Sequence, residues 1–171
     1  MMTYLVKCSA CAFETEIVPR NAWYENAKAT PTIAIHQTPG WCANCNCACF
    51  VEVVESIGEL QDVHQRLLAS GPEHFPRGPG NRSEAWLQEK ESLIEFVLER
   101  IGWRSKRMVP PRCLTCASTE YALLPTESAD SPDQALVCRH QNCAGVLVAK
   151  PHAISLPSKT YLYTAEGVEI K

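Results

Sequence analysis

Residues 41–49 read Trp-Cys-Ala-Asn-Cys-Asn-Cys-Ala-Cys and hold four of the ten cysteines in this 171-residue chain. The other six cysteines form two Cys-x-x-Cys pairs and one pair with four intervening residues. They are Cys8 with Cys11, Cys113 with Cys116, and Cys138 with Cys143. Two Cys-x-x-Cys pairs, each followed by a second cysteine cluster, supply the ligands of two tetrahedral metal sites. The cysteine spacing therefore predicts two structural Zn²⁺ ions.

The same pattern occurs twice along the chain, which indicates an internal repeat. Residues 7–12 and 112–117 both read basic-Cys-x-x-Cys-Ala, and residues 42–48 and 138–144 both start with Cys and end in Asn-Cys-Ala. An apolar stretch follows each return cluster. Repetition of this kind usually means that one supersecondary unit is used twice.

The first predicted zinc site draws all its ligands from the N-terminal repeat. Cys8 and Cys11 are its first pair, and Cys42 is its third ligand. The common two-residue spacing selects Cys45 as the fourth ligand, whereas the internal repeat selects Cys47. We favour Cys45, because two-residue turns are the commoner metal-binding knuckle.

The second predicted zinc site draws its ligands from the C-terminal repeat. Its four ligands are Cys113, Cys116, Cys138 and Cys143. Two residues also separate His140 from Cys143, so His140 is an alternative to Cys138. In both sites a tight turn presents two thiolates at once, and backbone N–H groups of that turn can donate to the sulfurs.

Metal thiolates are expected in preference to disulfides. Residues 1–7 contain no basic-then-apolar leader, and no apolar run approaches the roughly 20 residues needed to span a bilayer. We therefore expect a cytoplasmic, reducing location, where cysteines are kept as thiols. A mononuclear iron site would use the same four cysteines, and metal analysis separates the two ions.

The composition is that of an ordinary folded protein, with 46% hydrophobic and 20% charged residues. The net charge of −3 combines an acidic part, residues 1–99, with a basic part, residues 100–171. Such a balance does not fit a polycation that binds nucleic acid strongly and without specificity.

The pattern of apolar residues predicts an α+β fold in three parts. Residues 1–55 and 109–171 are each expected to form a small zinc-stapled β unit, and residues 56–108 a two-helix hairpin. Short strands are expected at 4–6, 13–17, 32–35, 50–55, 120–124, 134–137, 145–149 and 161–163.

Two helices are predicted between the β units. Apolar residues recur at helical spacing over 57–68, and this helix is expected to end at the Ser-Gly-Pro of 70–72. A second helix is expected from Asn81, where Glu84 can complete a capping box, to about Trp103.

The paired Cys-x-x-Cys turns at the tips of predicted β-hairpins resemble the zinc-ribbon group, over residues 3–55 and about 110–150. The resemblance implies that the knuckle cysteines hold zinc and that each ribbon serves as a recognition or scaffolding module. The chain lacks the Cys-Pro-x-Cys-Gly form common in that group, and its second return turn is longer than usual.

Three functions fit these features. The first is a non-enzymatic adaptor or regulator that binds a protein partner. It is supported by the acidic front half, by the absence of a metalloprotease or deaminase spacing around the histidines, and by aromatic residues of the kind favoured at interfaces. Those aromatic residues are Trp23, Tyr24, Trp41, Trp86 and Trp103.

The second function is nucleic-acid binding in a transcription-related role. Five of the sixteen basic residues fall within residues 100–112, where Trp103 could stack on a base. The residues that would bind phosphates and bases are Arg100, Trp103, Arg104, Lys106, Arg107 and Arg112.

The third function is an enzyme that uses thiol redox chemistry or zinc. Cys47 or Cys49, if left outside the first site, could act as a reactive thiol provided that its pKa were lowered. We favour the adaptor and expect no enzyme activity.

Overall fold

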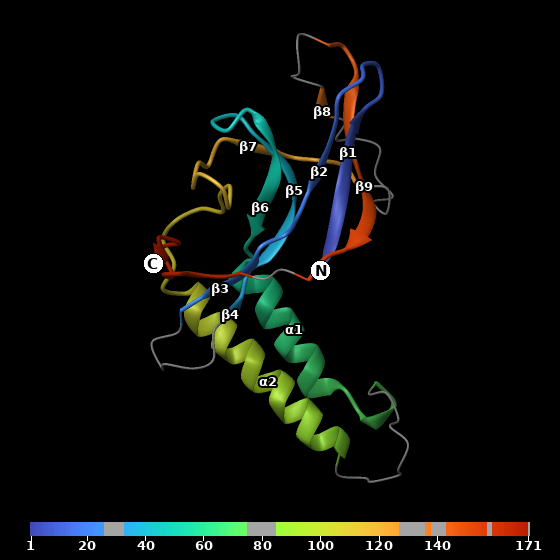
Figure 1. Cartoon of the computed structure of the whole chain (residues 1–171). Helices are drawn as coiled ribbons and strands as arrows, with labels where there is room; N and C mark the ends of the chain where they lie inside the picture. The colour runs from blue at the N-terminus through green and yellow to red at the C-terminus, as the bar shows by residue number, and fades with distance from the viewer. Residues whose placement is uncertain (26–32, 75–84, 127–135, 138–142, 157–158, 171) are drawn as a thin grey trace. The chain divides into compact units, whose positions relative to one another are not determined.

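The computed structural model describes residues 1–25, 33–74, 85–126, 136–137, 143–156 and 159–170. Figure 1 shows a chain of mixed α and β structure with two main helices and several small sheets. The chain divides into two compact units: the β unit joins Met1–Val54 with Val109–Lys171, and the helical unit is Glu55–Met108. The predicted α+β class with two helices is confirmed.

The first sheet brings the two ends of the chain together. It consists of β2 (Glu14–Ile17), β1 (Met2–Cys8), β9 (Val146–Ile154) and β8 (Leu136–Val137) in that order, with all neighbours antiparallel. Val6, in the central strand β1, is fully buried. β1 and β9 run side by side over most of their length in Figure 1.

The second sheet also combines both ends of the chain. Its order is β11 (Glu169–Ile170), β10 (Thr160–Tyr163), β3 (Asn21–Tyr24) and β4 (Ile33–Ala34), and β10 pairs with β3 in parallel. Strand β3 was not predicted; it pairs over four residues with β10, which lies far away in the sequence, and over only two residues with the nearby β4.

The third sheet carries the cysteine-rich stretch. Its order is β6 (Cys47–Val53), β5 (His36–Cys42) and β7 (Tyr121–Leu123), with antiparallel pairing. No strand was expected between residues 35 and 50, but β5 runs through Pro39. Glycine at position 40 allows β5 to lie close to β6 and β7, since a Cβ there would lie 2.9 Å from Val51 Cγ1 and 3.1 Å from the Ala122 carbonyl oxygen.

Aromatic contacts join the first and third sheets of the β unit. The rings of Tyr4 and Phe50 meet edge to face with centroids 6.0 Å apart. Phe13 and Trp41 do the same at 5.9 Å. Edge-to-face pairs of this kind are worth about 0.5–1.5 kcal/mol beyond the area that they bury.

A buried carboxylate lies within the β unit. Glu52 is 2% exposed and accepts a hydrogen bond of 2.7 Å from the Tyr24 hydroxyl. Arg112 Nε lies 3.5 Å from the same carboxylate. The charge of Glu52 is thus compensated by an arginine that directly precedes a cysteine pair, which ties the knuckle to β6.

The helical unit contains α1 (Ile57–Ala69), a 3₁₀ turn (Pro72–His74) and α2 (Ala85–Arg104). A capping box starts α1: the Ser56 hydroxyl accepts from the Glu59 backbone N–H at 3.1 Å, and the Glu59 carboxylate accepts from the Ser56 N–H at 2.7 Å. The sequence carries the Ser-x-x-Glu signal for this cap at residues 56–59.

Polar contacts hold the two helices together beside their packed faces. Lys90 of α2 donates to the backbone carbonyls of Leu68 (2.9 Å) and Ser70 (2.7 Å) at the end of α1. A lysine suits this place, because the last carbonyls of a helix carry partial negative charge. At the other end of α2, Arg100 donates to both carboxylate oxygens of Glu55 at 2.7 Å.

The observed topology differs from two separate ribbons in residues 1–55 and 109–171. Strand β1 pairs with β9, and β5 pairs with β7, so each of these sheets contains strands from both ends. The predicted cap at Asn81 and Glu84 lies outside the described residues.

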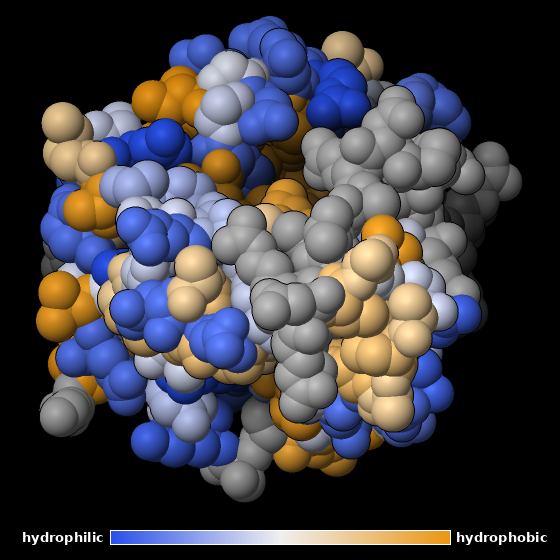
Figure 2. Space-filling model, turned by 90° about the horizontal axis from the view of Figure 1, so that it is seen from above, coloured by the Kyte–Doolittle hydropathy of each residue, from blue (hydrophilic) through white to orange (hydrophobic). Residues whose placement is uncertain are grey.

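Polar and apolar residues are interspersed over the face of the molecule shown in Figure 2. Apolar residues that are scattered singly over a surface are normal in folded proteins. A functional site on this molecule is therefore defined by particular side chains rather than by the hydropathy of this face.

Replacing Gly40 by Ala is expected to lower the free energy of unfolding by about 1 kcal/mol or more, because the new methyl group meets Val51 and a backbone carbonyl. Thermal and denaturant unfolding of the full chain measure this. Gly102→Ala is the control: it lies in α2 with nothing within 4 Å of its Cβ, and it should raise stability by about 0.5 kcal/mol. Equal effects of the two changes would contradict the close approach at Gly40.

Candidate metal centres

Four cysteine sulfurs converge at the cysteine-rich end of the third sheet. Cys42, Cys45, Cys113 and Cys116 place their Sγ atoms within 4.8 Å of one another. The Sγ atoms of Cys42 and Cys116 are 3.5 Å apart, and those of Cys45 and Cys113 are 4.0 Å apart. We call this group centre I.

Strand pairing brings the two cysteine pairs of centre I together. β5 ends at Cys42 and β6 begins at Cys47, so the turn between them presents one pair. An isolated bridge between Val51 and Cys113 places the other pair alongside β6. Cys42 and Cys113 are almost completely buried.

The turns of centre I have the backbone geometry of metal-binding knuckles. The backbone N–H of Cys45 donates to Cys42 Sγ at 3.4 Å, and that of Thr115 donates to Cys113 Sγ at 3.3 Å. The residue directly after each pair has positive φ: 50° at Asn46 and 61° at Ala117. These two residues stand where the zinc-ribbon form has glycine, which adopts such a φ without strain.

A second group joins the two ends of the chain. Cys8, Cys11 and Cys143 also place their Sγ atoms within 4.8 Å of one another, and those of Cys8 and Cys143 are 3.6 Å apart. Pairing of β1 with β9 aligns Cys8 with Leu147 and so brings Cys143 to the first knuckle, the turn of Cys8 and Cys11. We call this group centre II. Cys138 and His140, the candidates for its fourth ligand, lie outside the described residues.

The same N–H to sulfur contacts recur in centre II. The backbone N–H of Ala10 donates to Cys8 Sγ at 3.4 Å, and that of Gly145 donates to Cys143 Sγ at 3.3 Å. Gly145 also permits the close approach of the two segments, because a Cβ there would lie 2.5 Å from Cys8 Sγ.

The structure groups the cysteines differently from the sequence prediction. The expected sites paired Cys8 and Cys11 with the 42–45 turn, and the 113–116 turn with Cys143. Instead, the 42–45 turn meets the 113–116 turn, and the first knuckle meets Cys143. The expectation that each repeat fills its own site is wrong, because the strands that carry the knuckles pair across the repeats.

Ionisation of centre I is uneven. Burial raises the pKa of the Cys42 and Cys45 thiols. Burial also opposes ionisation of Cys116, but hydrogen bonds from the Asn44 side chain, the Cys45 thiol and the Ser118 backbone outweigh it and lower the pKa of Cys116 to about 6. A metal ion must therefore displace protons from the Cys42 and Cys45 thiols, so its affinity falls as the pH falls.

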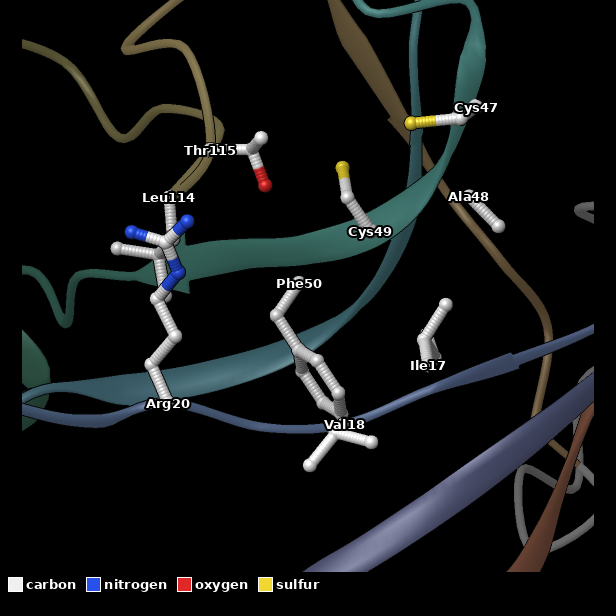
Figure 3. Close-up of a pocket in the computed structure, with 9 residues that line it drawn as sticks. All are labelled: Ile17, Val18, Arg20, Cys47, Ala48, Cys49, Phe50, Leu114 and Thr115. Carbon is white, nitrogen blue, oxygen red and sulfur yellow. The ribbon is translucent and has the colours of Figure 1, made fainter. Parts of the chain in front are cut away.

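Cys47 and Cys49 lie beside centre I. Cys49 is 4% exposed, and its Sγ lies 3.5 Å from Cys113 Sγ, whereas Cys47 is exposed. Both border the cavity drawn in Figure 3. Burial raises the pKa of both thiols, which is the opposite of the shift that activates a nucleophilic cysteine.

The residues proposed for nucleic-acid binding are mostly engaged within their own units. Arg100 is bound by Glu55, and Arg104 donates to the backbone carbonyls of Glu55 and Arg107. Arg107 stacks over the ring of Trp103 at 5.4 Å. In the β unit, Arg112 lies against Glu52. Of the six residues, only Lys106 is exposed.

The donor set of centre I fits a thiolate-preferring ion. With metal–sulfur bonds of about 2.3 Å, the sulfurs of a tetrahedral zinc site lie about 3.8 Å apart. The separations of 3.5 and 4.0 Å in centre I bracket that value. Four thiolates complete the coordination and leave no position for water, as in structural sites.

No family model, curated protein or solved structure matches this chain. The class of site is therefore defined by the geometry of the two cysteine groups, which could each hold a metal ion. Among the described residues, no helix combines the length and apolar character needed to cross a membrane.

Replacing Ala117 by Gly is expected to stabilise the β unit by about 0.5–1 kcal/mol, since a left-handed φ costs an alanine about 1–2 kcal/mol and glycine adds back some unfolded-state entropy. Thermal unfolding of the metal-loaded protein measures the gain. Ala12→Gly is the matched control: it also follows a Cys-x-x-Cys pair but lacks positive φ, and it should destabilise. A gain at both positions would contradict strain at Ala117.

Proposed function

We propose that this chain is a non-enzymatic zinc-binding protein in which two structural thiolate centres organise the β unit and the helical unit binds a protein partner. The closed set of four cysteines in centre I carries the first part of the proposal. Catalytic zinc sites keep an open position for water or substrate. Four thiolates leave no such position, so the role that fits this centre is structural.

The surface of α2 supports the second part. Leu87, Ile94 and Leu98 follow one another at spacings of seven and four residues, which places them on one side of the helix. Leu87 is 43% exposed and Leu98 is 48% exposed. A stripe of this kind, which leaves two leucines in water, suits contact with a protein surface.

The same helix carries an acidic fringe. Glu89, Glu91 and Glu95 are exposed along α2. Glu91 follows Leu87 by four residues and Glu95 precedes Leu98 by three, so these two lie beside the apolar stripe, whereas Glu89 is on the other side of the helix. Acidic residues beside an apolar stripe favour a protein partner with basic residues, through complementary potentials, and disfavour nucleic acid. The arginines of residues 100–112 already contact groups within their own units, which also disfavours nucleic-acid binding. The adaptor is therefore preferred to the nucleic-acid-binding alternative.

Removing metal from both centres is expected to unfold the β unit and leave α1 and α2 protected. Zinc binding in comparable peptides is worth roughly 10–16 kcal/mol, more than short strands can gain by pairing. Hydrogen exchange of the full chain, with and without a strong chelator, measures protection segment by segment. The control is the same chelator saturated with zinc. Retained protection in β1, β5, β6 and β9 would contradict a structural role for the metal.

Replacing Leu98 by Glu is expected to weaken partner capture at least tenfold, about 1.4 kcal/mol, because it places a charge in the apolar stripe. The zinc-loaded chain serves as bait, and bound proteins are quantified. Gln88→Glu is the control, since it adds the same charge at an exposed position of α2. Capture that does not depend on Leu98 would contradict the proposed surface, as would salt-sensitive oligonucleotide binding with no protein captured.

A further inference from the structure

The sulfurs around centre I number six rather than four. The two extra ones come from the first residues of β6 and lie on the same face of that strand, because they are two residues apart. The six cysteines are Cys42, Cys45, Cys47, Cys49, Cys113 and Cys116.

These six sulfurs fall into three pairs. The Cys45 and Cys113 sulfurs, 4.0 Å apart, form the middle pair. The Cys42 and Cys116 sulfurs, 3.5 Å apart, form the second pair, and Cys47 and Cys49 form the third.

The extra thiols contact the middle pair. Cys49 Sγ lies 3.5 Å from Cys113 Sγ, and the Cys47 thiol interacts with the Cys45 thiol. Each extra thiol therefore has one member of the middle pair as its neighbour. In two tetrahedra that share an edge, the outer sulfurs neighbour the shared pair, and Cys45 and Cys113 would be that shared pair here.

The extra thiols face open space in which a metal ion could enter. Cys47, Cys49 and Thr115 line a cavity of about 220 Å³. In Figure 3 the Cys47 sulfur points toward the side of the cavity where the Cys49 sulfur lies, and the Thr115 hydroxyl points into the same space. Cys49 is buried and Cys47 exposed, so the site would have an inner and an outer ligand.

We propose that centre I is a binuclear thiolate cluster that holds two Zn²⁺ ions, with Cys45 and Cys113 bridging them. One ion is bound by Cys42 and Cys116 together with the bridging pair. The other is bound by Cys47 and Cys49 together with the same pair. This inference rests on the proposed zinc site, because the bridging thiolates belong to it.

The charge balance favours the second ion. A single Zn²⁺ with four thiolates carries a charge of −2. Adding a second Zn²⁺ and ionising two further thiols leaves the charge at −2, since two protons go to water. The site thus gains a metal ion without accumulating charge in a partly buried place, where uncompensated charge is costly.

With the cluster, nine of the ten cysteines of the chain belong to one of the two centres. Six belong to centre I, and three of the remaining four form centre II in the described residues. Cys138 is the tenth. Soft thiolate ligands in this number select zinc, copper(I) or iron–sulfur chemistry over oxygen-preferring ions.

Native mass spectrometry of the reduced full chain, reconstituted with zinc and freed of excess metal, tests the proposal. The wild type is expected to hold three zinc ions: two in centre I and one in centre II. Cys47→Ser/Cys49→Ser is expected to hold two. The single variant Cys47→Ser, at an exposed position, should also lose the third ion if the double variant folds poorly. Val53→Thr, an exposed change on the same strand, should retain three.

Cadmium NMR with a spin-½ isotope adds an independent readout. Two cadmium ions that share thiolates give mutually coupled signals, and the coupling should vanish in Cys47→Ser/Cys49→Ser. Two zinc ions in the wild type would overturn the cluster and leave the proposed function standing. A third ion that persists in the double variant, or lacks coupling, would also overturn it. Fewer than two ions in the wild type would overturn both proposals.

Discussion

The convergence of sulfurs from distant parts of the chain is the constraint on which the β unit depends. Centre I joins Cys45 to a cysteine 68 residues away, and centre II joins Cys8 to one 135 residues away. A metal ion bound at either centre would close a loop of that length, and the entropy cost of loop closure grows with loop length. The strands involved are short, with two to nine residues each.

Strand pairing and cysteine grouping reinforce each other. β1 and β9 align the first knuckle with Cys143, and the Val51–Cys113 bridge aligns the other knuckle with β6. Glycines occupy two positions where segments approach closely. A Cβ at Gly145 would clash with Cys8 Sγ, and a Cβ at Gly40 would clash with the Val51 side chain. The buried carboxylate of Glu52 contacts Tyr24 and Arg112. Because Arg112 directly precedes Cys113, this contact helps to position the 113–116 turn beside β6.

Local signals in the sequence predicted the helices, the knuckles and the α+β class, because spacing within a few residues decides these features. The grouping of knuckles was not predictable in the same way. The repeat of Asn-Cys-Ala at 46–48 and 142–144 is equally compatible with filling each site within a repeat or across repeats. Only the long-range pairing of β1 with β9, and of β5 with β7, separates these outcomes. Strand β5 was missed for a related reason: Pro39 and Gly40 have the local signature of a turn, but their neighbours in the sheet override it.

The crossed grouping has a consequence for how the chain folds. Among the described residues each cysteine group combines both repeats, so the 42–45 turn meets residues 113–116, and the 8–11 turn meets Cys143, only after those later residues are made. The helical unit needs nothing beyond Glu55–Met108 for the Glu55–Arg100 pair and the contact between α1 and α2. Because it is complete before the last cysteines are synthesised, the helical hairpin can form first. If both centres bind zinc as proposed, their closure is the late step that joins the ends of the chain, and the β unit would then depend on a supply of metal at that step.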